Sequence, residues 1–150
     1  MLAEILVSFL VFTLAVAGAV YGYTQTNRMA DYTAMSLAAQ SEALQGAERA
    51  RGAAWNPYKA YPPVDQLNLP LNAPTNTAIA VFTNIDFMDI PSKGSPSSSD
   101  FAYWVTNYVY VTPLSYNPNL RQIRSDAIWT YPPTGQLITT TVMDLRAPDQ

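Results

Sequence analysis

The pattern of hydrophobic and polar residues changes twice along this chain. From Leu2 to about Ala54 nothing interrupts a helix, because the first proline is Pro57 and the glycines are isolated. The first half of this stretch is apolar on every side, whereas the second half is rich in alanine, leucine, glutamine and glutamate, which are good helix formers. We therefore predict one helix of about 50 residues, roughly 75 Å long. In its second half a weakly apolar face recurs at spacings of three and four, at Ala30, Ala34, Leu37, Ser41, Leu44 and Ala47.

After a proline-rich loop at residues 56–76, the pattern changes to an alternation with period two, which is typical of half-buried strands. Four strands are predicted, at residues 77–85, 101–111, 123–131 and 137–145, and Pro132-Pro133-Thr134-Gly135 predicts a tight hairpin between the last two. The positions assigned to one face of each strand are Thr77, Ile79, Val81, Thr83 and Ile85; Phe101, Tyr103, Val105, Asn107, Val109 and Val111; Ile123, Ser125, Ala127, Trp129 and Tyr131; and Leu137, Thr139, Thr141, Met143 and Leu145.

These elements predict an α+β fold, in which a long N-terminal helix packs against a C-terminal antiparallel sheet of three to four strands. We divide the chain into residues 1–24, the apolar half of the helix; residues 25–55, its amphipathic half; and residues 56–150, a globular β domain.

The apolar half of the helix is long enough to cross a bilayer, which takes about 20 residues. Glu4 is the only charged side chain among the first 27 residues. A carboxylate in such a segment costs roughly 2.5–3.5 kcal/mol at the centre of a membrane, so we expect it to have a partner charge. The candidate partner is the α-amino group of Met1, in the same chain or in a neighbouring copy. No Lys or Arg precedes the apolar run, so we do not expect a secretory signal peptide. We expect either an ordinary N-terminal anchor or a mature chain whose basic leader has been removed.

Composition narrows the chemistry that the globular part can perform. The formal net charge is −3, which argues against a nucleic-acid partner held through its phosphates. The absence of cysteine and histidine excludes disulfides, thiolate chemistry and the commonest general base and metal ligand. We find no nucleophile motif or phosphate-binding loop, so we expect neither an enzyme nor a bound cofactor.

The segment Leu2-Ala3-Glu4-Ile5-Leu6-Val7-Ser8-Phe9 resembles the start of mature type IV pilins and type II secretion pseudopilins. The order of long helix, loop and C-terminal antiparallel sheet is also similar to that family over the whole chain. In the family the glutamate stands fifth in the mature chain, whereas here it stands fourth, so we carry over no exact processing site.

The resemblance implies a subunit that a prepilin peptidase processes in the bacterial inner membrane and whose new N-terminus is methylated. The pilus assembly machinery then stacks the helices of many copies into an extracellular or periplasmic filament. In such a homo-oligomer Met1 of one copy would neutralise Glu4 of another, which sets the register of the stack more than it adds stability.

Two glycines, a serine-rich loop and two groups of acidic residues each have a functional interpretation and a simpler one without a function. Gly18 and Gly22 match a small-xxx-small contact between membrane helices or a point of local helix flexibility, but sequence drift explains them equally well. Ser97, Ser98 and Ser99 lie in a loop that we expect to be exposed and mobile, where O-linked sugars are one interpretation and a plain loop the better one. Two groups of residues carry oxygen atoms that Ca²⁺ can bind: Asp86, Asp89 and Ser92, and Asp144 with Asp149. Because neither group matches a calcium-binding loop, we interpret these acids as solvated loop residues and expect no metal.

The sequence thus predicts a structural subunit of a type IV pilus-like filament. The alternatives are a minor pilin or pseudopilin of a secretion or DNA-uptake system, a single-span anchored binding domain that never polymerises, and, more weakly, an anchored hydrolase that uses Asp and Ser.

Overall fold

A computed structural model of the 150-residue chain describes residues 2–59, 64–70, 73–88, 90, 103–116 and 119–149. The predicted helix is present as α1 (Leu2–Gly52), with Glu4 in its first turn and two arginines in its last. Both placements complement the partial charges at the helix ends. The chain forms two compact units that meet after Ala34, so α1 contributes to both.

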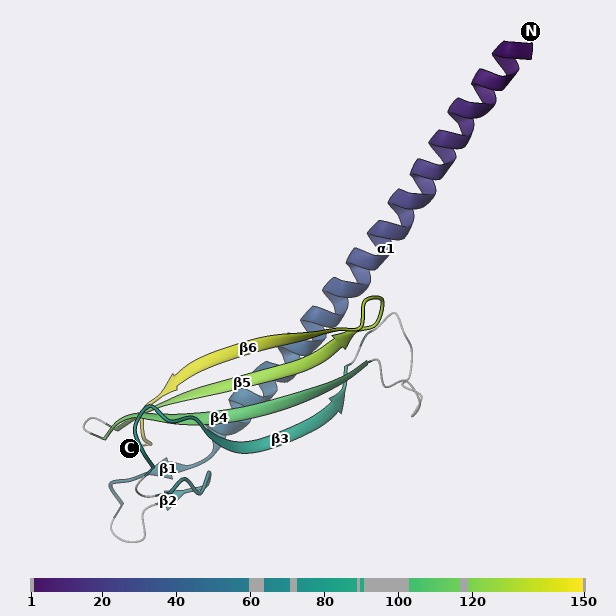
Figure 1. Ribbon diagram of the computed structural model, residues 1–150. Helices are drawn as coiled ribbons and strands as arrows, with labels where there is room; N and C mark the ends of the chain where they lie inside the picture. The colour runs from purple at the N-terminus through teal and green to yellow at the C-terminus, as the bar shows by residue number, and fades with distance from the viewer. Residues whose placement is uncertain are drawn as a thin grey trace. The chain divides into compact units, whose positions relative to one another are not determined.

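The second unit contains the predicted antiparallel sheet (Figure 1). Its strands are β3 (Ile79–Phe87), β4 (Trp104–Tyr116), β5 (Asn119–Tyr131) and β6 (Gln136–Arg146), which pair in that order as a meander. A separate two-stranded sheet joins β1 (Trp55–Asn56) to β2 (Val64–Asp65). The α+β prediction is therefore confirmed, with four strands in the main sheet.

The hairpin between β5 and β6 is also confirmed. Gly135 has φ +66°, and its N–H donates to the carbonyl of Tyr131 at 2.8 Å. Glycine adopts this left-handed conformation without the steric cost that a Cβ would bring, which explains the glycine at the end of the turn.

The predicted alternation in β4 and β5 is confirmed over residues 105–113 and 123–129, where every second residue is buried. These residues face α1 and form the centre of the core: Val105, Asn107, Val109 and Val111 from β4, and Ile123, Ser125, Ala127 and Trp129 from β5. Of the other predicted members of these faces, Tyr103 precedes β4, Tyr131 is half-buried and Phe101 lies outside the described residues.

The face prediction for β3 is wrong beyond its first residues. A bulge between Ala80 and Phe82 shifts the register, so Phe82 and Asn84 lie opposite the buried Val109 and Asn107 of β4. Ile85, assigned to the same face as Ile79, is consequently turned away and 64% exposed. One extra residue reverses the alternation, and a strict period of two does not anticipate it.

In β6 the alternation is present, but the face that we singled out points outward. Leu137, Met143 and Leu145 are exposed, while Ile138 and Val142 lie on the side of the core. Apolar residues occur on both faces of this strand, so the sequence pattern does not distinguish the inner face from the outer one.

The predicted apolar face of α1 is wrong for nearly all its members. Leu37 and Leu44 are exposed, and Ala47 is the one predicted residue that is buried. The face that packs on the sheet consists of Met35, Ala39, Ala43, Gly46, Ala47 and Ala50. Apart from Met35 it is made of alanine and glycine, because the helix backbone approaches the sheet closely at Gly46.

Candidate functional site

The first unit presents the candidate functional surface, which is the apolar part of α1. Its large hydrophobic side chains are all exposed, from 78% at Leu2 to 44% at Val16. The helix is long and apolar enough to cross a membrane, and none of this apolar stretch is buried by other described residues. A surface of this kind on a folded chain indicates contact with lipid or with other protein.

Hydroxyl groups in and beside this segment are satisfied by the helix itself. Thr13 Oγ1 donates to the carbonyls of Phe9 and Leu10 at 3.0 and 2.9 Å, and Thr24 Oγ1 donates to that of Tyr21 at 2.8 Å. Back-bonding of this type lowers the cost of placing a hydroxyl in an apolar environment. The segment is therefore chemically suited to a surrounding without water.

Three of the predicted assembly and packing residues lie in this segment, and the fourth, Met1, lies outside the described residues. Glu4 is in the first helical turn. A Cβ added at Gly18 or Gly22 would meet no atom within 4 Å, and α1 is continuous through both positions. Their roles in contact or flexibility stay predictions, because no described residue packs against either glycine.

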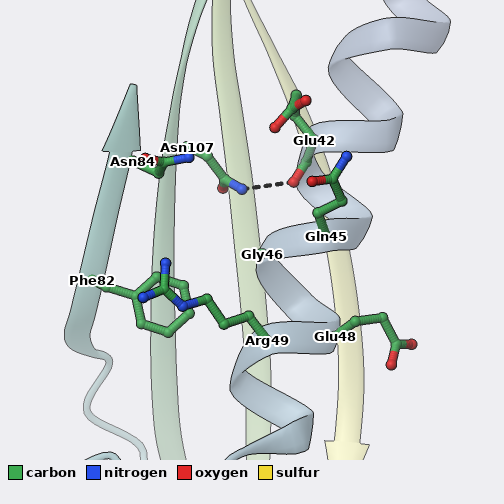
Figure 2. Close-up of a pocket in the computed structure, with 8 residues that line it drawn as sticks. All are labelled: Glu42, Gln45, Gly46, Glu48, Arg49, Phe82, Asn84 and Asn107. Atoms are coloured by element: carbon green, nitrogen blue, oxygen red, sulfur yellow. Dashed lines mark hydrogen bonds between the residues drawn. The ribbon is translucent and has the colours of Figure 1, made fainter. Parts of the chain in front are cut away.

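The second unit holds the rest of α1 against the sheet through a buried polar cluster. Asn107 Nδ2 donates to the carbonyl of Glu42 at 2.7 Å (Figure 2). Ser125 Oγ in turn donates to Asn107 Oδ1 at 2.8 Å. Asn107 and Ser125 are 5% and 0% exposed. Gly46 lies directly over this pair, where a Cβ would overlap Asn107 and come within 2.7 Å of Ser125 Oγ.

A second set of contacts joins the end of α1 to the C-terminal segment. We call it the Trp55 clamp, and it consists of Trp55, Arg121, Arg146 and Asp149. The Trp55 N–H donates to Asp149 Oδ2 at 2.7 Å, and the Asp149 N–H donates back to the Trp55 carbonyl at 2.8 Å. Arg146 donates to both Asp149 oxygens at 3.1 and 3.2 Å and to the carbonyl of Ala50 at 3.1 Å. The clamp therefore satisfies a carbonyl of the last turn of α1, which has no partner within the helix.

Arg121 completes the Trp55 clamp from β5. Its guanidinium carbon lies 3.9 Å from the centroid of the Trp55 ring, and Arg121 NH2 is 2.6 Å from Asp65 Oδ2 on β2. The Trp55 side chain is almost fully buried. The sequence analysis did not predict this arrangement, because its contacts between elements join residues that are 56 to 96 positions apart.

The hydrogen bond from the Trp55 N–H, and then that from Arg146, lowers the pKa of Asp149 below its ordinary value. The Trp55 clamp is thus strongest when this carboxylate is ionised.

The acids considered as Ca²⁺ ligands have other contacts. Asp144 pairs with Arg51 of α1 at 3.4 Å, and Asp149 belongs to the Trp55 clamp. Asp86 accepts a hydrogen bond from the backbone N–H of Phe87 at 2.8 Å. Asp89 and Ser92 lie outside the described residues, as do Ser97, Ser98 and Ser99. Within the described part of the chain no three His, Cys, Asp or Glu residues gather in a group that could hold a metal ion.

A cavity of about 390 Å³ lies between α1 and β3 (Figure 2). It is lined mainly by carboxylate, carboxamide and guanidinium groups, and Arg49 lies 4.8 Å from the centroid of the Phe82 ring. Burial, and secondarily the negative charge of Asp86, raises the pKa of Glu42 on its wall. The lining offers hydrogen bonds to a polar group but no nucleophile paired with a base.

No protein-family model, no curated protein and no solved structure matches this chain.

Proposed function

We propose that this protein is a structural subunit of a bacterial type IV pilus-like filament, which polymerises through its N-terminal apolar helix. The observation that carries the proposal is the fully uncovered apolar half of α1, with a single carboxylate in its first turn. Eleven large aliphatic or phenyl side chains are exposed between residues 2 and 20. Covering a side chain of this size is worth about 1.5–3 kcal/mol, so the segment requires a partner surface.

Lipid supplies that surface before assembly, and the helices of other copies supply it afterwards. Small residues among the large ones, including Gly18 and Gly22, present open surface where a second helix can approach closely. The second half of α1 is held on the sheet by the Asn107 cluster and the Trp55 clamp. In this proposal the sheet domain remains folded while its apolar segment exchanges lipid for protein.

Glu4 has the role of a register residue in this proposal. A carboxylate within a bundle of apolar helices is costly unless a positive charge stands beside it. The ammonium group of Met1 in the adjacent copy meets that need only in one axial alignment of the two helices. This restriction selects one stacking among many that would bury the apolar side chains equally well.

The test is electron microscopy of filaments from cells that express Glu4→Ala, with Ser8→Ala as the matched control in the same segment. Loss of one member of a buried ion pair costs roughly 3–5 kcal/mol, which corresponds to a loss of assembly of more than a hundredfold. The Ser8→Ala variant should assemble as the unaltered chain does. Normal filaments from Glu4→Ala would refute the register role.

If the unaltered chain forms no filaments and carries no N-methyl group by mass spectrometry, the protein is instead an anchored domain. A helix that is long and apolar enough to cross a membrane serves a single-span anchor equally well. The abundant and the minor subunits of such a filament share this architecture, and immunogold labelling along the filament would distinguish them.

A further inference from the structure

The free edge of β6 differs from the other free edge of the main sheet. Among the described residues β5 is the hydrogen-bonded neighbour of β6, so the backbone groups on the opposite side of β6 have no strand beside them. Edge strands in natural proteins are commonly protected from further pairing by charges, prolines, bulges or short length. On β3 the bulge between Ala80 and Phe82 and the exposed Asp86 provide such protection.

No such protection is present on β6. Its pairing with β5 runs without a register shift from Gln136 to Arg146. Residues 136–143 contain no charged residue and no proline, and the first charge is Asp144. Leu137 and Met143 on its outward face are 69% and 59% exposed. Over residues 136–143 this strand is regular and uncharged, which is the form of edge that accepts another strand.

The sequence of β6 is complementary to itself about Thr140. If a second copy pairs with it antiparallel so that Thr140 lies opposite its own equivalent, each residue faces one of matching character. On the outward face Leu137 meets Met143 and Thr139 meets Thr141, while on the inward face Ile138 meets Val142. At the ends Gln136 lies opposite Asp144, so no like charges meet.

Other registers that keep inward residues opposite inward residues are poorer. A shift of the centre to Thr141 places Ile138 opposite Asp144, and a shift to Thr139 places Leu137 opposite Thr141. A one-residue change of phase would oppose inward to outward side chains. One alignment is therefore preferred over its neighbours.

We propose that β6 is a homotypic docking edge, at which two copies of this chain join their sheets through antiparallel pairing about Thr140. The pair has a two-fold axis, and in such an interface each copy contributes the same surface. Consecutive subunits of a helical filament are related by a screw operation rather than a two-fold axis. The β6 pair therefore joins copies that run in opposite directions, such as those of two filaments lying side by side, and it does not depend on Glu4.

Disulfide cross-linking of the full-length chain in detergent tests this alignment, because the protein has no cysteine of its own. An equal mixture of Leu137→Cys and Met143→Cys should form a disulfide dimer at least ten times faster than either variant alone. In the proposed register Leu137 of one copy lies opposite Met143 of the other. The two Leu137 residues of a dimer, like the two Met143 residues, are instead six residues apart along the strand, or roughly 20 Å. Ile85→Cys, exposed on β3, mixed with either variant is the control and should remain monomeric.

A second variant tests the contact without relying on oxidation. Thr139→Lys with Thr141→Lys places lysines opposite each other across the proposed dyad and should abolish dimers by light scattering, whereas Ile85→Lys should not. Thermal melting verifies that both variants are folded. Equal cross-linking in all mixtures, or dimers that persist in the double lysine variant, would overturn the proposal. Glu4→Ala should leave the cross-linking unchanged, which separates this outcome from that of filament assembly.

Discussion

The contact between α1 and the sheet predicts that Gly46→Ala destabilises the protein although alanine is the better helix former. The exchange gains about 1 kcal/mol of helix propensity. The new Cβ, however, would overlap Asn107 Nδ2, lie 2.7 Å from Ser125 Oγ and lie 2.9 Å from Val109 Cγ2. Overpacking of this kind costs about 1–3 kcal/mol, and each buried hydrogen bond that it displaces costs about 1–3 kcal/mol more.

We therefore expect a net loss of about 2–4 kcal/mol in the free energy of unfolding, which corresponds to a fall in Tm of roughly 8–16 °C. The assay is thermal or denaturant unfolding of the full chain in detergent, followed by the near-ultraviolet signal of the tryptophans. Gly52→Ala is the matched control, because a Cβ there meets nothing within 4 Å. It should change stability by no more than about 1 kcal/mol.

A double-mutant cycle identifies the cause. In an Asn107→Ala background the closest of the three contacts is removed, while those to Ser125 Oγ and Val109 Cγ2 remain, so Gly46→Ala should cost less there than in the unaltered chain. If Gly46→Ala is neutral or stabilising in the unaltered chain, or costs the same in both backgrounds, the close-approach reasoning is wrong.

Two further predictions concern pH. The hydrogen bonds from Trp55 and Arg146 lower the pKa of Asp149, so the ionised carboxylate contributes its full stabilisation above the ordinary pKa of an aspartate, and this contribution is lost as pH falls through the lowered value. In thermal melts between pH 2 and 5, Asp149→Asn should therefore lose less stability with falling pH than the unaltered chain. Because the pKa of Glu42 is raised by burial and by Asp86, the folded state loses stability as pH rises from the ordinary glutamate pKa through the raised one. Glu42→Gln should therefore be more stable than the unaltered chain at pH 7 and equal to it near pH 3, and equal melting temperatures at pH 7 would contradict this reasoning.

Local patterns determined much of the fold. The absence of proline before Pro57 predicts the long helix, and the alternation around Val109 and Ile123 predicts two central strands with the correct inner face. The hairpin at Gly135 follows from the requirements of its turn. Each of these signals depends on neighbours within a few residues, so it can be read from the sequence without knowledge of the partner element.

The tertiary structure alone decided which residues of α1 and of the second half of β3 face the core. The bulge in β3 turned Ile85 outward, and close contact with the sheet selected Gly46 over Leu44 as the inner face of α1. Hydrophobic periodicity indicates neither outcome, because a bulge interrupts the period of a strand and because alanine and glycine are less hydrophobic than the exposed leucines of α1.

The Trp55 clamp is the furthest from sequence-based prediction, since it forms between residues up to 96 positions apart. The apolar half of α1 is the opposite case, because its composition alone shows a helix long and apolar enough to cross a membrane. The sequence by itself therefore determined that the protein has a segment to be covered. Only the tertiary structure decided how the rest of the helix is held on the sheet, because that depends on contacts between residues far apart in the chain.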